Sequence, residues 1–229
     1  MFRLATPSFV YPTGRCCNAL HLAGMVDEVE LLYCEHGELI DPWEIEVLRR
    51  LPVDYHIHLP MDLELDSPAA WRRMHAMADM LEVLSPTTYT LHPAAGPEFL
   101  AGVRDFASRF PGRVSVENVN GDLEVFRQLE HDDHLCYCLD VGHAVLFGTS
   151  VGGFLERWGH KVSHFHLHGV DGDRDHRELR HLDEAVLATV VDFARRHRRV
   201  ISVEVFGMEP FVNSLQHLRN FCEQNHNPD

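Results

Sequence analysis

Positive charge is scarce in this chain of 229 residues. Only 20 Lys and Arg stand against 35 Asp and Glu, which gives a formal net charge of −15 with His neutral. A surface of this sign repels nucleic acids and anionic membranes. We therefore expect neither as a partner and look for a small-molecule substrate; the sequence leaves the oligomeric state open.

Long apolar runs and a paired-cysteine framework are also missing. No apolar run approaches the length that spans a membrane, and residues 1–4 lead into a strand-like run without the charged and apolar regions of a leader. No CxxC spacing occurs among the six cysteines, which are Cys16, Cys17, Cys34, Cys136, Cys138 and Cys222. Thiols in this pattern are typical of a reducing compartment, so we expect a cytoplasmic protein.

Nucleotide-binding motifs are absent as well. The residues after the first strand-like run, Pro7–Val10, form no glycine-rich phosphate turn, and no P-loop occurs elsewhere. An open, doubly wound sheet normally carries such a turn. Because the glycine-rich turn is absent, the open sheet is the less favoured fold for a chain in which strands and helices alternate.

Strand and helix signals alternate from end to end. Strand-like runs lie near 3–9, 28–34, 54–59, 87–92, 113–118, 134–140, 162–168 and 199–206. Helical spacing follows each one, most clearly in Trp71, Met74, Ala78 and Leu81 behind the N-terminal signal Ser67-Pro68. Eight strand–helix units predict an α/β fold, a (β/α)8 TIM barrel, as a single domain over residues 1–229.

Alternation within the strands indicates which side chains face the barrel interior. One parity is apolar throughout: Ile57, Leu91, Val116, Leu139, Phe165 and Val203. The other is polar or small: His56, Thr90, Ser115, Cys138, His164 and Ser202. Because side chains two apart share a face, the apolar set should pack against the outer helices and the polar set should point inward. Cys136 and Cys138 should lie too deep to be ligands.

Good metal ligands stand where the strand-like runs stop. Three carboxylates, Glu117, Asp140 and Glu204, should meet at one barrel mouth, together with imidazoles from several of the 18 histidines. No Lys or Arg lies at these strand ends, so bound metal ions are the expected compensation. Mixed imidazole and carboxylate ligation favours Zn, with Mn, Fe or Co as alternatives.

The same residues resemble a known superfamily. The segments HLP, LHP, VEN, LDVGH, HFHLHG, DRDH and SVEVFG occur in the order found in xylose-isomerase-like TIM barrels, and most closely in the endonuclease IV branch. That branch carries a trinuclear zinc site. The resemblance implies eight metal ligands: His58, His92, Glu117, Asp140, His143, His166, His176 and Glu204. It leaves open whether Asp173 or Asp175 joins His176.

Within the superfamily, four segments resemble the cobamide-remodelling phosphodiesterases. These are residues 8–12, 26–32, 58–63 and 166–170. The resemblance implies a metal-dependent hydrolase that cleaves the phosphodiester in the nucleotide loop of vitamin B12-like corrinoids. The endonuclease IV enzymes grip DNA with basic loops, whereas this chain is acidic and short, so DNA repair is not expected.

The alternative activity is that of a sugar or sugar-phosphate isomerase or epimerase with one divalent metal. It needs only Glu117, Asp140, His166 and Glu204, with the two glutamates also moving protons as catalytic residues. Eight ligands are too many for one ion and suit two or three, which favours the phosphodiesterase. Tyr11 and His168 are the expected substrate contacts.

Overall fold

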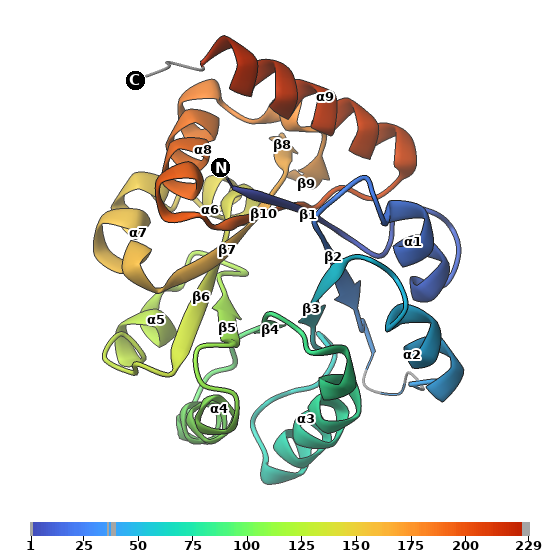
Figure 1. Ribbon diagram of the computed structural model, residues 1–229. Coiled ribbons are helices and arrows are strands. Elements are labelled where there is room, and N and C mark those ends of the chain that lie inside the picture. Colours follow the sequence, from blue (N-terminus) through green and yellow to red (C-terminus); the bar gives the residue numbers. More distant parts are fainter. Residues whose placement is uncertain (1, 36, 38–39, 226–229) are drawn as a thin grey trace.

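A closed barrel of eight parallel strands forms the centre of the computed structural model, which describes residues 2–35, 37 and 40–225 (Figure 1). Around the barrel the strands run in the order β1-β10-β7-β6-β5-β4-β3-β2. Their bounds are β1 Arg3–Pro7, β2 Glu28–Leu32, β3 Asp54–His58, β4 Tyr89–Leu91, β5 Val114–Glu117, β6 Leu135–Asp140, β7 Val162–Leu167 and β10 Val200–Val203. The predicted TIM barrel is confirmed.

The helices other than α6 (Val141–Leu146) surround the barrel in chain order (Figure 1). They are α1 Arg15–Leu22, α2 Pro42–Leu48, α3 Pro68–Leu81, α4 Pro97–Arg109, α5 Glu124–Gln128, α7 Val151–Trp158, α8 Glu184–His197 and α9 Met208–Gln224, with single 3-10 turns at Glu82–Leu84, Gly159–Lys161 and Leu179–His181. Helix α3 begins as predicted, because the Ser67 side chain accepts a hydrogen bond from the Ala70 amide. None of the described helices combines the length and the apolar character needed to cross a bilayer.

Two local elements differ from the predicted strand–helix alternation. The short helix α6 starts directly from the last residue of β6, and a hairpin of β8 (Gly169–Asp171) and β9 (Arg174–Arg177) stands between β7 and α8. Neither has enough residues for a periodic pattern to appear in the sequence. Both lie at the end of the barrel where the strands stop, so they shape the site.

The predicted alternation is confirmed in the barrel wall. The side chains of Ile57, Leu91, Val116, Leu139, Phe165 and Val203 are all fully buried in the hydrophobic core. The opposite set meets inside the barrel, where Thr90 Oγ1 lies 3.1 Å from His164 Nε2 and the His56 and His164 rings are 5.2 Å apart. A polar interior therefore leads up to the mouth.

Candidate metal centre

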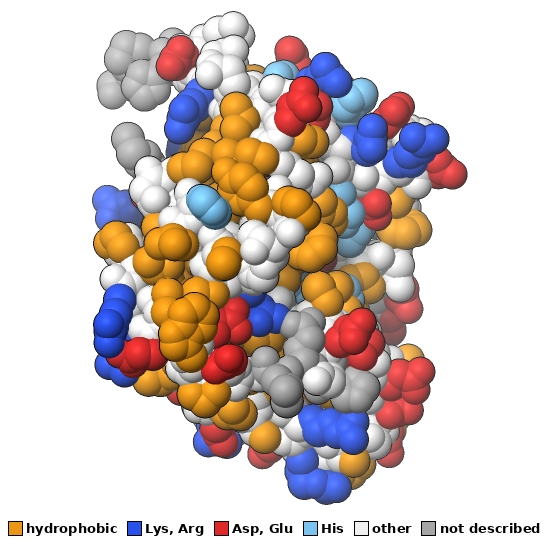
Figure 2. Space-filling view, turned by 90° about the vertical axis from the view of Figure 1, so that its right-hand side faces the viewer, with side chains coloured by type: hydrophobic (Ala, Val, Ile, Leu, Met, Phe, Trp, Pro, Cys, Tyr) orange, Lys and Arg blue, Asp and Glu red, His pale blue; other side chains and the backbone are white. Residues whose placement is uncertain are grey.

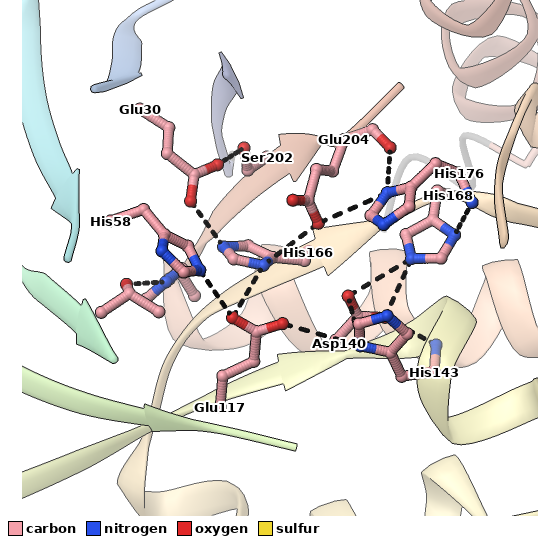
Figure 3. A network of polar contacts seen from close by, with 12 residues as sticks. Glu30, His58, Glu117, Asp140, His143, His166, His168, His176, Ser202 and Glu204 are labelled. Carbon is pink, nitrogen blue, oxygen red and sulfur yellow. Dashed lines mark hydrogen bonds and ion pairs between the residues drawn. The ribbon is translucent and has the colours of Figure 1, made fainter. Parts of the chain in front are cut away.

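Glu117, the last residue of β5, lies at the middle of the site (Figure 3). Its Oε2 is 3.1 Å from His58 Nε2, 3.4 Å from His166 Nδ1 and 3.6 Å from His92 Nε2. Its Oε1 is 3.6 Å from His143 Nδ1. A carboxylate among four imidazoles is placed to be shared between neighbouring cations.

Asp140 and His143 approach from one turn. Asp140 ends β6 and caps α6, where its Oδ1 accepts a hydrogen bond of 2.7 Å from the His143 amide. The ring of His143 then folds back, with Nδ1 3.1 Å from Asp140 Oδ2. Its Nε2 lies 3.6 Å from Oδ2 of Asp175. Asp175 is thus the acid of the hairpin that lies beside these imidazoles, and no such contact is found for Asp173 among the described residues.

Glu204 and His176 close the other side of the site. Glu204 follows β10 and holds Oε2 3.2 Å from His166 Nδ1, while His176 Nδ1 donates to the Glu204 carbonyl over 3.1 Å. His176 stands in the hairpin with φ of 48°, in the left-handed region that few residues other than glycine adopt. The hairpin therefore carries His176 to the mouth from outside the barrel strands, where strand register alone could not place it.

Burial shifts the acid–base balance of these groups. Although burial opposes ionisation, the neighbouring imidazoles hold the pKa of Glu117 well below its usual value. Burial also opposes a charged His166, but Cys138, Glu30, Glu204 and Glu117 raise its pKa well above the usual value. The carboxylates thus favour positive charge at this position, which a metal cation would supply.

The donor atoms fit a divalent metal. The rings of His58, His143 and His176 each have Nδ1 placed to donate to a backbone carbonyl, those of Leu59, Asn118 and Glu204 respectively. This arrangement leaves the Nε2 lone pair free and is the usual one for metal-binding imidazoles. In addition, both ring nitrogens of His166 and Glu204 Oε2 are buried and make no hydrogen bond among the described residues, although His166 Nδ1 and Glu204 Oε2 lie only 3.2 Å apart. Such atoms are costly unless a cation meets them.

A cavity of about 220 Å³ opens onto the site. Six of the eight predicted ligands line it, namely His58, His92, Glu117, His143, His176 and Glu204. The remaining lining is largely apolar and includes Phe9, Met61 and Phe206, which are 55%, 46% and 42% exposed. A substrate entering the cavity would meet polar groups at its floor and apolar side chains at its rim.

The two predicted substrate contacts lie elsewhere. Tyr11 packs its ring against His21, with centroids 4.8 Å apart, and does not line the cavity. His168 is fully buried, and its Nε2 lies 3.1 Å from Asp140 Oδ1. Its Nδ1 lies 2.9 Å from the His176 amide nitrogen and 3.2 Å from the Gly169 carbonyl, so both ring nitrogens are engaged inside the protein. The geometry makes His168 a support for Asp140 rather than a contact on the open side.

Gly142 provides the space for this support. A Cβ at this position would lie 2.0 Å from Cε1 of His168. We expect Gly142→Ala to displace the His168 ring, to destabilise the chain by about 1–3 kcal/mol, as overpacking does, and to reduce activity. Thermal unfolding and metal binding measure the effects on stability and on the site.

Gly152 in α7 is the matched control, because nothing lies within 4 Å of a Cβ there and the backbone is helical. Gly152→Ala should leave the site intact and stabilise the helix by about 0.5–1 kcal/mol. Equal stability and equal metal binding in the two variants would contradict the role given to Gly142.

Sequence reasoning missed Glu28 and Glu30. They occupy β2, are 1% and 0% exposed, and alternate with the core residues Val29 and Leu31. Strand parity, which assigns the inner face of the other strands, places both carboxylates inside the barrel when it is applied to β2. Cys138 also lies nearer the site than expected, since its Sγ and ligand atoms of Glu117 and His166 are all within 4.8 Å of one another.

Comparisons with known proteins identify the fold. No protein-family profile and no curated protein matches the chain. Among solved structures, a D-tagatose 3-epimerase-like protein is 18% identical with a TM-score of 0.77, covering 97% of this chain and 98% of its own. The TTHB071 protein from Thermus thermophilus, soaked with ZnCl2, is 23% identical with a TM-score of 0.67 over 99% of both chains.

A third match is a 3-keto-D-glucoside 4-epimerase from E. coli, which is 14% identical with a TM-score of 0.68 over 98% of both chains. At these sequence identities, structural similarity is evidence of a shared fold alone. Two of the three names are those of sugar epimerases, and none is that of a cobamide hydrolase. The chain therefore shares the TIM-barrel fold of these proteins.

Proposed function

We propose that this chain is a metal-dependent hydrolase that cleaves a single phosphodiester in a compact substrate. The observation that carries the proposal is the overlap of three-ligand groups at the mouth. His58 and His92 share Glu117 with the group of Glu117, Asp140 and His143, and His143 and His176 recur in a further group that also contains His168. Shared ligands of this kind suit two or three ions, whereas one ion would leave several imidazoles without a role.

Different residues of the site have different roles in the proposed hydrolysis. Glu117, at the floor of the cavity, and the buried Asp140 would hold positive charge, while His92 and His176, with side chains 27% and 21% exposed, would hold metal on the open side of the cavity. Divalent metals, when bound, supply the charge that neutralises phosphate oxygens and makes water nucleophilic. Glu204 Oε2 makes no hydrogen bond among the described residues although it lies 3.2 Å from His166 Nδ1, and we assign Glu204 to take the proton of the attacking water.

The substrate class follows from charge and from the rim. On the face shown in Figure 2, Lys and Arg side chains are scattered among Asp and Glu side chains, and the described residues form no continuous basic patch there. Such a surface does not favour polyanionic DNA. A phosphodiester attached to a bulky group would reach the floor, while that group stays at the rim and packs on Phe9, Met61 and Phe206. The cobamide nucleotide loop fits this requirement, and its choice rests on the sequence resemblance.

Sugar isomerisation or epimerisation is the second candidate, and the comparisons favour it over the phosphodiesterase. Its core set is present: Glu117 and Glu204 lie 3.4 Å and 3.2 Å from Nδ1 of the same imidazole, His166. One ion held by these three residues and Asp140 would leave both glutamates beside a bound sugar. The imidazoles His58, His92, His143 and His176 would then have no part in the reaction.

A parallel assay separates the two candidates. We expect metal-loaded protein to convert a complete cobamide to a cobinamide-type corrinoid, to leave abasic-site DNA intact and to leave keto and aldo sugars unchanged. Chromatography and absorbance spectra follow all three substrates. Turnover of a sugar with inert cobamide would reject the hydrolase and select the epimerase, while leaving the shared core ligands in place.

A further inference from the structure

A line of charged side chains crosses the barrel interior beneath the metal centre. It begins at Arg3, whose Nη1 lies 3.2 Å from Oε2 of the buried Glu28. Glu28 Oε1 is 2.9 Å from His56 Nδ1, and His56 Nε2 is 3.5 Å from Glu30 Oε2. Glu30 Oε1 is in turn 3.0 Å from His166 Nε2. These contacts thus connect the far end of the barrel with the imidazole of His166 at the mouth.

Glu30 is fixed in its place. Its side chain is 0% exposed, and its Oε2 accepts a hydrogen bond of 2.9 Å from the Ser202 hydroxyl (Figure 3). His56 lies between Glu30 and Glu28, so one imidazole faces both carboxylates. Burying a carboxylate with these partners costs less free energy of folding than burying an isolated one. Two apolar side chains in place of Glu30 and His56 would nevertheless stabilise the barrel equally well. The position of Glu30 directly under His166 therefore points to a role in the site.

The two nitrogens of His166 face opposite sides. Nε2 faces Glu30, whereas Nδ1 faces Glu117 and Glu204, at 3.4 Å and 3.2 Å. A carboxylate beneath one ring nitrogen draws the ring proton to that nitrogen and leaves a lone pair on the other. Glu30 is the acid on the interior side, and the two mouth carboxylates are candidate ligands themselves.

We propose that Glu30, backed by Ser202 and by the His56–Glu28 pair, is a positioning residue that keeps the proton of His166 on Nε2 and directs Nδ1 at the metal. The inference rests on the metal centre of the proposed function. It also assigns a role to Glu28 and Glu30, which neither candidate reaction requires by itself. Loss of such a supporting carboxylate typically lowers metal affinity about 10- to 100-fold.

The test compares Glu30→Gln with Thr90→Val. Thr90 is equally buried and contacts His164 Nε2 at 3.1 Å, and no contact joins it to His166 among the described residues. Zinc affinities are measured by competition with a chromophoric chelator. We expect Glu30→Gln to weaken one ion about 10- to 100-fold, and Thr90→Val to leave every affinity unchanged. Ser202→Ala should weaken the same ion to a smaller extent, which keeps the test informative if Glu30→Gln does not fold.

A second measurement determines which nitrogen of the His166 ring carries the proton. Nitrogen NMR of the zinc-loaded wild type should show His166 protonated at Nε2 and bound through Nδ1. Protonation at Nδ1, unchanged affinity in Glu30→Gln, or equal losses in Glu30→Gln and Thr90→Val would each overturn the inference. Neither measurement needs a substrate. If Glu30→Gln loses zinc affinity as expected but the wild type does not cleave cobamide, the result would count against the proposed function alone. A wild-type chain that binds no zinc would overturn both.

Discussion

Glu117→Gln should remove metal from the protein while leaving the barrel folded. The substitution keeps the shape of a side chain that is 1% exposed, but it removes the charge that four imidazoles surround. Because Glu117 belongs to several of the three-ligand groups, we expect metal content to fall and activity to drop at least about 100-fold, as when an electrostatic group of an active site is lost. Elemental analysis measures the metal, and circular dichroism shows whether the barrel is folded.

Glu64→Gln is the matched control for this substitution. Glu64 lies in the exposed loop after β3 and lines a separate cavity beside His92. Its loss changes the net charge by the same amount without touching Glu117, so metal content and activity should remain those of the wild type. Equal losses in the two variants, or full metal content in Glu117→Gln, would refute the place given to Glu117.

Removal of metal should lower the melting temperature substantially. Clustered carboxylates are stabilised by bound cations, and a ligand that binds only the folded chain adds about 2.7 kcal/mol when its concentration is 100 times its Kd. For a chain of this size, 1 kcal/mol corresponds to about 2–4 °C. We therefore expect zinc to raise the melting temperature of chelator-treated protein by roughly 5–10 °C for each ion bound. Differential scanning calorimetry measures the shift.

The Glu117→Gln variant serves as the reference in the same experiment. With the shared carboxylate gone, zinc should shift its melting temperature far less than it shifts that of the wild type. If complete chelation leaves the wild-type curve unchanged, the clustered residues do not form a metal centre. If zinc shifts both proteins equally, the ions bind elsewhere.

Much of the fold can be predicted because strand parity is a local property. The alternation in residues 54–58 and 162–167 assigns an inner and an outer face without any knowledge of the partner strands. The ends of β5, β6 and β10 then place Glu117, Asp140 and Glu204 at one mouth, since parallel strands all stop at the same end of a barrel. The structure brings these residues and the predicted imidazoles together.

The missing parts depend on contacts that no local pattern encodes. The hairpin that presents His176 and Asp175 has too few residues for a period, and the His176 backbone is left-handed. The burial of His168 depends on space left by Gly142, a residue far from it in the sequence. Tyr11 and Phe9 are both aromatic residues after β1, and only the path of the loop decides which of them reaches the cavity.

The metal content of the wild-type chain tests the central claim most directly. Protein purified without chelator, dialysed against trace zinc and analysed for metal per chain should contain two or three ions. We expect that number because His58, His92, His143 and His176 lie beside the core set of Glu117, Asp140, His166 and Glu204. A single ion per chain would contradict the polynuclear centre and would favour the epimerase.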